Sequence, residues 1–65
     1  MSNLRTIREE RRADAKRYTL EAMAEAAGVS VPTYLQLEEH PERLKLGQAE
    51  RLARHLGVTV AELLL

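Results

Sequence analysis

The chain has 65 residues, a length that allows one small domain with a modest core. It contains no cysteine, which excludes disulfide bonds and thiolate metal sites. Its 10 basic and 10 acidic residues cancel, so it lacks the positive excess typical of nucleic-acid-binding domains. We expect a single domain over residues 1–65.

No apolar run approaches the roughly 18 residues that a membrane-spanning helix needs. Residues 2–12, SNLRTIREERR, are too polar for a signal peptide. We therefore expect a cytoplasmic protein with no membrane partner. Ala, Leu, Glu and Arg are the most common residues, and because all four favour helix, we predict an all-α fold.

The first predicted helix begins near Ser2 or Asn3, either of which can cap it. Its inward stripe is predicted to be Leu4, Ile7, Arg11 and Ala15. Basic side chains crowd this N-terminal quarter, namely Arg5, Arg8, Arg11, Arg12, Lys16 and Arg17. They form either a local basic face or the ordinary solvated sides of helices, and both interpretations stay open.

The stretch from Leu20 to Glu39 has the spacing of two short helices joined by a tight turn at Gly28. Thr19 caps the earlier helix, and Tyr18 is expected to pack near Met23 as a hydrophobic staple. Gly28 suits the left-handed backbone that ends such a helix. A small residue, a glycine four positions later and apolar residues beyond it are typical of a helix-turn-helix; here these residues are Ala24, Gly28, Val29, Tyr34 and Leu37.

The later helix of this pair is capped by Ser30 and carries Pro32 in its first turn, where a missing N–H costs nothing. Tyr34 and Leu37 are predicted to face the core. The opposite face presents Val31, Pro32, Thr33, Leu35 and Gln36. Gln can bond adenine through two hydrogen bonds in the major groove, so this face is a candidate for reading DNA bases.

Two more helices complete the predicted fold. The fourth ends at Gly57, pairs Glu50 with Arg54 on its outer side, and buries Leu46, Ala49, Leu52, Ala53 and Leu56. Thr59 and Glu62 form a capping box that opens the fifth. We expect Val58, Leu63 and Leu64 to cover the core, and Val60 and Leu65 to be exposed.

The segment GVSVPTYLQLEEHP, residues 28–41, resembles the DNA-binding core of the lambda-repressor/Cro-type helix-turn-helix family. IREER, residues 7–11, is similar to the family's first helix, and LGVTVAELL, residues 56–64, to its last. The nearest likeness is to short phage and prophage transcriptional regulators. The resemblance implies five helices, double-stranded DNA as partner, a possible homodimer, and an ion pair between Arg8 and Glu38.

The resemblance also implies a set of DNA contacts. Bases would be contacted by Val31, Pro32, Thr33 and Gln36. Phosphates would be contacted by Lys16, Arg17, Thr19, Leu20, Ser30, Arg43 and Lys45. The sequence departs from the family where Leu20 replaces the usual glutamine, and where Val31 and Pro32 replace polar residues. The alternative is that Val31, Pro32 and Leu35 form an apolar patch that binds a protein partner, as in an antitoxin or an adaptor.

Nothing in the sequence points to an enzyme. No histidine stands beside a plausible nucleophile, and no glycine-rich phosphate loop is present. His40 and His55 lack a second ligand at a useful spacing, so we expect surface residues rather than a metal site. We expect no cofactor and no small-molecule substrate.

Overall fold

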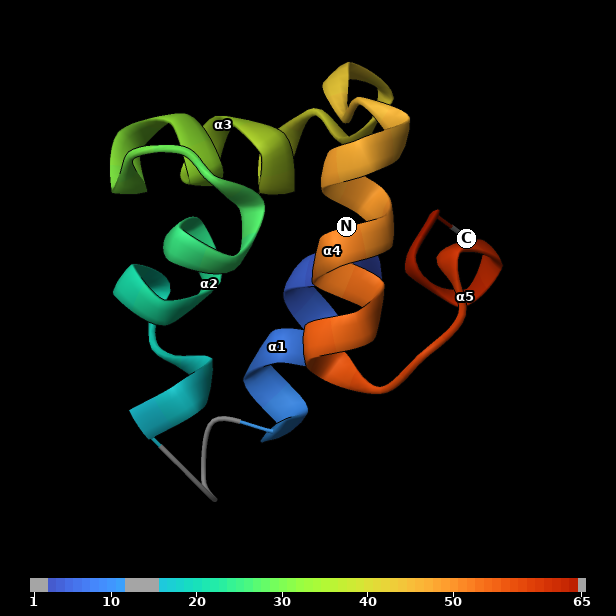
Figure 1. The fold of residues 1–65 in the computed structure, drawn as a ribbon, viewed down its shortest axis with the longest axis horizontal. Coiled ribbons are helices and arrows are strands. Elements are labelled where there is room, and N and C mark those ends of the chain that lie inside the picture. The colour runs from blue at the N-terminus through green and yellow to red at the C-terminus, as the bar shows by residue number, and fades with distance from the viewer. Residues whose placement is uncertain (1–2, 12–15, 65) are drawn as a thin grey trace.

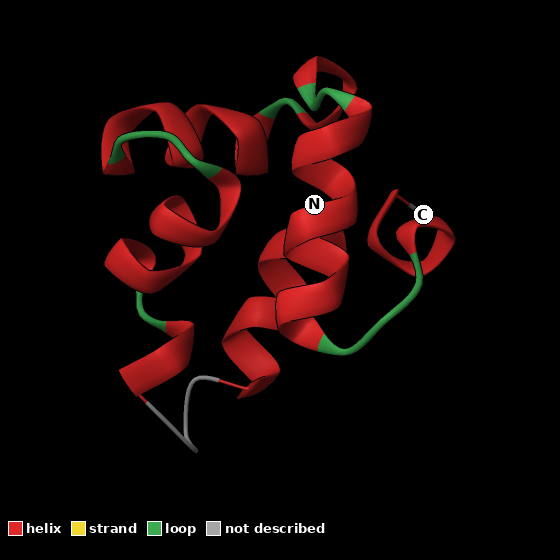
Figure 2. Cartoon of the chain, viewed as in Figure 1, coloured by secondary structure: helices red, strands yellow, loops and turns green. Residues whose placement is uncertain are grey.

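The computed structural model describes residues 3–11 and 16–64, and within these ranges the fold is all-α with five α-helices. The helices are α1 (Asn3–Arg11), α2 (Leu20–Ala27), α3 (Val31–Glu39), α4 (Leu46–Leu56) and α5 (Val60–Leu64). Two short 3-10 turns, η2 (Lys16–Tyr18) and η3 (Pro41–Arg43), precede α2 and α4. The connecting loops are short (Figure 2). The predicted five-helix, all-α fold is confirmed.

All five helices contribute to one core. α2 packs against α3 and α4, while α5 packs against α1 and α4, so α4 runs between α2 and α5 (Figure 1). The side chains of Leu4, Met23, Tyr34 and Leu52 are completely buried. The remaining members of the core are Ile7, Ala24, Ala27, Ala49, Leu56 and Leu63. Helix α3 packs mainly against α2 and therefore lies at one edge of the molecule.

The helix-turn-helix forms as the sequence predicts. Thr19 Oγ1 accepts a hydrogen bond from the Ala22 N–H at 3.2 Å, which caps α2. Gly28 ends α2 with a φ of 75°, and the Val29 N–H bonds the Ala24 carbonyl at 3.0 Å. This six-to-one bond is the signature of a Schellman turn, which satisfies carbonyls at the end of a helix. After this turn the chain enters α3, which begins at Val31.

The C-terminal half repeats this design. Gly57 ends α4 with a φ of 73°, and the Val58 N–H bonds the Ala53 carbonyl at 2.9 Å. Thr59 and Glu62 then form the predicted capping box, because the Glu62 N–H bonds Thr59 Oγ1 at 3.1 Å and the Thr59 N–H bonds Glu62 Oε1 at 3.5 Å. Asn3 Nδ2 donates to the Glu62 carbonyl, which ties the start of α1 to α5.

Two leucines that we expected in the core are exposed. Leu46 is 70% exposed because it is the first residue of α4, and a side chain there tilts back beyond the end of the helix. Leu64 is 50% exposed because its neighbour Leu63 takes the inward position, and successive helix residues point about 100° apart. Conversely, Val60, which we expected to be exposed, is partly buried and packs against the core.

Several smaller expectations also need correction or lie outside the described residues. Arg5 and Arg8 pair with Glu38, and His40 pairs with Glu42, whereas the predicted pair of the described residues Glu50 and Arg54 does not form. The expectations for Ser2, Arg12, Ala15 and Leu65 lie outside the described residues. In the described part of the chain no helix is long and apolar enough to cross a membrane.

Candidate nucleic-acid interface

The outer face of α3 is open to solvent. Its exposed side chains are Pro32, Thr33, Leu35, Gln36 and, in the last turn, Glu39. The inner face is held by Tyr34 and Leu37, which are 0% and 5% exposed, as predicted. Because α3 packs mainly on α2, its opposite side is left uncovered at the edge of the molecule (Figure 1). A face of this kind is available to a groove of DNA or to a protein.

Val31 differs from its predicted neighbours on this face. It is partly buried and packs against the core, because it stands three residues before Tyr34 on the same side of the helix. Only an edge of its side chain can therefore meet a base. The base-reading candidates that stand fully outward are Pro32, Thr33 and Gln36.

At the start of α3 the hydroxyl groups of Ser30 and Thr33 are hydrogen-bonded to each other. Ser30 Oγ accepts from the Thr33 N–H at 3.4 Å and donates to Thr33 Oγ1 at 3.0 Å. The Ser30 proton is therefore engaged, whereas the Thr33 hydroxyl keeps its own proton to donate outward. The geometry favours Thr33 over Ser30 as the donor to an incoming oxygen.

The start of α2 borders a hollow of about 310 Å³, which is lined by Arg8, Thr19, Leu20 and Glu21. The Thr19 hydroxyl accepts from Ala22 and donates to the Lys16 carbonyl at 3.2 Å, so both of its roles are taken within the fold. The Leu20 side chain packs against the core. What Leu20 offers outward is its backbone N–H at a helix N-terminus, where an anion is stabilised.

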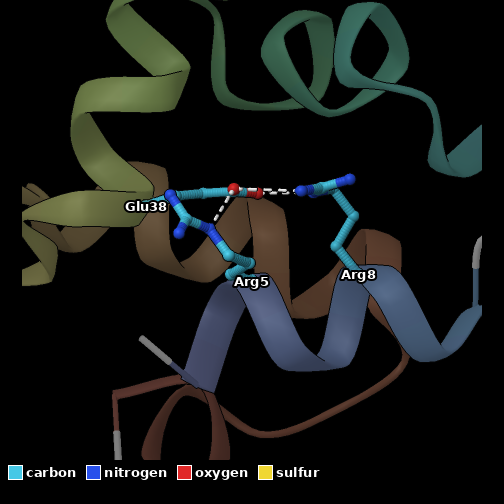
Figure 3. A network of polar contacts seen from close by, with 3 residues as sticks. All are labelled: Arg5, Arg8 and Glu38. Carbon is cyan, nitrogen blue, oxygen red and sulfur yellow. Dashed lines mark hydrogen bonds and ion pairs between the residues drawn. The ribbon is translucent and has the colours of Figure 1, made fainter. Parts of the chain in front are cut away.

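A buried charge cluster fixes α3 to α1. Glu38 is completely buried, and its carboxylate accepts from Arg8 Nε at 2.5 Å, Arg8 Nη2 at 3.1 Å and Arg5 Nε at 3.3 Å (Figure 3). Arg8 itself is 7% exposed. The pair that the family resemblance implied is confirmed, and Arg5 is an additional member that the sequence did not reveal.

The cluster alters three pKa values. Its hydrogen bond to Glu38 raises the pKa of Arg8. Burial alone would raise the pKa of Glu38, but the hydrogen bonds from Arg8 and Arg5, together with the adjacent Tyr34 hydroxyl, outweigh burial and hold that pKa below its ordinary value. Burial, followed by the nearby Glu38 carboxylate, raises the pKa of Tyr34. The Tyr34 hydroxyl lies beside the carboxylate but makes no well-aligned hydrogen bond to a described residue. Glu38 therefore stays ionised at neutral pH.

The segment after α3 forms a 3-10 turn, η3, over Pro41–Arg43. The Arg43 N–H bonds the His40 carbonyl at 2.9 Å, and the Leu44 N–H bonds the Pro41 carbonyl at 3.1 Å. Lys45 then stands at the N-cap of α4, where the Gln48 side chain accepts from its backbone N–H at 3.0 Å. Both Arg43 and Lys45 are exposed, as a phosphate contact requires.

Two further cations, Lys16 and Arg17, are exposed on η2. The Arg17 guanidinium carbon lies 5.7 Å from the centre of the Tyr18 ring, within the range of a cation–π contact. The starts of α2 and α3 lie at one end of α3, whereas η3 lies at the other end (Figure 1). In Figure 1 η2 lies beyond α2, on the side away from α3, so the candidate phosphate contacts form two separate groups rather than one continuous patch.

Both histidines have partners within the fold. His40 Nδ1 lies 3.3 Å from Glu42 Oε2 on η3. His55, which we expected to be a simple surface residue, contacts η2 through Arg17 and Tyr18. Among the described residues no three His, Asp or Glu side chains come together in a way that could hold a metal ion.

Sequence reasoning missed Arg51. Its Nη1 atom lies 3.7 Å from the position that a Cβ on Gly28 would occupy, so the guanidinium rests against the turn of the helix-turn-helix. Its Nε donates to the Gly47 carbonyl at 3.3 Å. A cation at this place stabilises the C-terminal end of α2. Its position depends on how α4 crosses α2, which no local sequence pattern encodes.

A family model described as helix-turn-helix matches residues 7–63, which is most of the chain. The protein belongs to the Cro/C1-type helix-turn-helix family. Comparisons with curated proteins and with solved structures returned no match. The match covers α2, the Gly28 turn and α3, and domains of this family bind double-stranded DNA. The arrangement is therefore that of a lambda-repressor-like, DNA-binding helix-turn-helix domain.

Proposed function

We propose that the protein is a sequence-specific transcriptional regulator of the repressor/Cro type, of the kind found in phages and prophages. The observation that carries this proposal is the outer face of α3, which the Gly28 turn and the Arg8–Glu38 pair hold outward at the edge of the molecule. A helix of nine residues in such a position fits the major groove of B-DNA.

In the proposed complex α3 reads the bases. Gln36 bonds an adenine edge through its amide, and the outward proton of Thr33 bonds a base or a phosphate. Pro32 and the exposed edge of Val31 contact a thymine methyl group. Leu35 is 37% exposed and adds apolar surface beside them.

The DNA-backbone contacts come from two separate segments, η3 after α3 and η2 before α2. Arg43 and Lys45 meet phosphates beyond its C-terminal end. Lys16, Arg17 and the Leu20 N–H meet phosphates at the start of α2, while the Thr19 and Ser30 hydroxyls shape these helix starts. These contacts fix the register of the protein on the duplex.

We further propose that residues 1–65 act as one cytoplasmic domain and that two copies bind a two-fold operator. One short helix offers few base contacts, and a second copy doubles them. In such a dimer the two α3 helices lie about 34 Å apart, which is one turn of DNA.

The experiment that tests the proposal is a selection of bound sequences from random duplex oligonucleotides. The proposal expects enrichment of a short motif with two-fold symmetry. Recovery of random sequences, with equal affinity for all duplexes, would contradict specific regulation. Affinity measured at two salt concentrations then separates phosphate contacts from base contacts.

A second candidate function, a protein-interaction module on the same fold, is favoured by one observation. The exposed face of α3 carries Pro32 and Leu35 together with the acidic Glu39, and none of its residues is basic. Passage over heparin or random duplex DNA at low salt distinguishes the two functions. Retention supports the DNA-binding regulator, whereas free passage supports the interaction module.

A further inference from the structure

The basic segment η2 is connected to the rest of the molecule through His55 on α4. Nε2 of His55 lies 2.6 Å from the Arg17 carbonyl oxygen. Because that oxygen can only accept, Nε2 must carry the proton and donate it. This bond joins residues that are 38 positions apart in the chain.

An aromatic contact reinforces the bond. The rings of His55 and Tyr18 meet edge to face, with centroids 5.7 Å apart and an interplanar angle of 71°. Tyr18 in turn lies beneath the Arg17 guanidinium at 5.7 Å and packs partly buried against the core. His55 therefore contacts both the backbone of Arg17 and the ring on which the Arg17 side chain rests.

Little else fixes η2 to α4. The other described side-chain hydrogen bond to η2 is local, from the Thr19 hydroxyl to the Lys16 carbonyl. Between Arg17, α2 and His55 the surface is hollowed by about 450 Å³, lined in addition by Ala22, Glu25 and Ala26. η2 itself packs against α2, and the His55 bond ties the Arg17 backbone to α4 as well, so the backbone from which Lys16 and Arg17 project depends in part on His55.

We propose that His55 is a positioning residue that holds Lys16 and Arg17 in place to contact DNA phosphates at the start of α2. This inference rests on the proposed DNA-binding function. It assigns to α4 a role in DNA binding through a residue that does not itself touch DNA. A lysine or arginine side chain that is already ordered loses less conformational entropy when it binds a phosphate than a mobile one does. Loss of the His55–Arg17 hydrogen bond should therefore weaken binding to every DNA sequence alike.

The test compares His55→Phe with His55→Gln. Phenylalanine keeps the ring against Tyr18 but cannot donate, whereas the glutamine amide places a donor near the position of Nε2. We expect His55→Phe to weaken binding to random duplex by about fivefold, the factor of one ordinary hydrogen bond, and His55→Gln to restore most of it. The slope of log affinity against log salt should become shallower by up to about one in His55→Phe.

A double-mutant cycle separates positioning from a general loss of stability. In a Lys16→Ala/Arg17→Ala background, His55→Phe should have no further effect on affinity or on the salt slope. An equal loss in both backgrounds, or an unchanged affinity and slope in His55→Phe alone, would overturn the inference.

The bond is also measurable without DNA. Side-chain ¹⁵N NMR of the free protein should find the proton of His55 on Nε2, with a coupling across the bond to the Arg17 carbonyl. A proton on Nδ1 alone would overturn the His55 inference and leave the proposed DNA binding intact. Unchanged duplex binding by the Lys16→Ala/Arg17→Ala variant would instead overturn the phosphate role of η2, and the inference with it.

Discussion

At the scale of the residue, Arg43 and Gln36 represent the two kinds of contact that the proposed function needs. Both are exposed, and they stand on η3 and on the outer face of α3. A phosphate contact contributes affinity without sequence preference, whereas a base contact contributes preference. The two roles are therefore separable by substitution.

Arg43→Ala should weaken binding to all duplexes alike and reduce the salt slope by about one, because one fewer counterion is released. The matched control is Arg54→Ala, which removes another exposed arginine, from the last turn of α4. Fluorescence anisotropy over a salt series measures both quantities. Identical slopes for wild type and Arg43→Ala would show that Arg43 makes no phosphate contact.

The positions of some individual side chains could be predicted from the sequence, whereas others could not. Tyr34, Leu37 and the Arg8–Glu38 pair are placed as expected, because helical spacing and the family resemblance both identify them. Val31 was predicted outward and is partly buried, since it shares a side of α3 with Tyr34. His55 and Arg51 act through contacts across helices, and such contacts depend on packing that no local pattern describes.

At the scale of the element, the helix-turn-helix depends on a left-handed residue at Gly28. A Cβ there would meet only the flexible end of Arg51, at 3.7 Å, so the cost of a side chain is conformational rather than steric. Gly47 provides the contrast. It lies within α4, and nothing lies within 4 Å of an added Cβ.

Gly28→Ala should therefore lower the free energy of unfolding by about 1–2 kcal/mol, the cost of a left-handed alanine. Gly47→Ala should raise it by up to about 1 kcal/mol, because alanine favours helix. Chemical denaturation of the two variants measures both values. A stability loss in Gly47→Ala equal to that in Gly28→Ala would contradict the conformational explanation.

The link between α1 and α3 is an element-scale feature with a pH signature. The pKa of Glu38 is lowered from its ordinary value of 4.5, so the unfolded chain takes up this proton at a higher pH than the fold does. The stability that Glu38 contributes is therefore complete above pH 4.5 and is lost as the pH falls below that value. Denaturation midpoints measured across the acid range should follow this course.

Glu38→Gln removes the counter-charge of a buried arginine and should cost roughly 3–5 kcal/mol, most of the stability of a domain of this size. It should also flatten the acid dependence. Arg5→Ala is the matched control, and because its side chain is 36% exposed, we expect at most about 1 kcal/mol. Equal losses in the two variants would contradict the assignment of Arg8 as the principal partner of Glu38.

At the scale of the whole molecule, the order of the helices and the bounds of α2, α3 and α4 followed from sequence signals that are local. Thr19, Ser30, Gly28 and Gly57 mark helix ends by their own chemistry, and the structure places them there. Burial at the helix ends did not follow, because Leu46 tilts back beyond the start of α4 and because Leu63, not Leu64, takes the inward position on α5. That the candidate phosphate contacts form two separate groups, on η2 and near η3, could likewise be seen only in the folded structure.

The most direct measurement is the affinity of the wild type and of Gln36→Ala for a selected duplex and for a scrambled duplex of equal composition. We predict that the wild type prefers the selected duplex by at least about 10³-fold at physiological salt. Gln36→Ala should lose about 1–3 kcal/mol of that preference and keep its affinity for the scrambled duplex. Equal preference in the two proteins, or none in the wild type, would contradict the account that α3 reads DNA sequence.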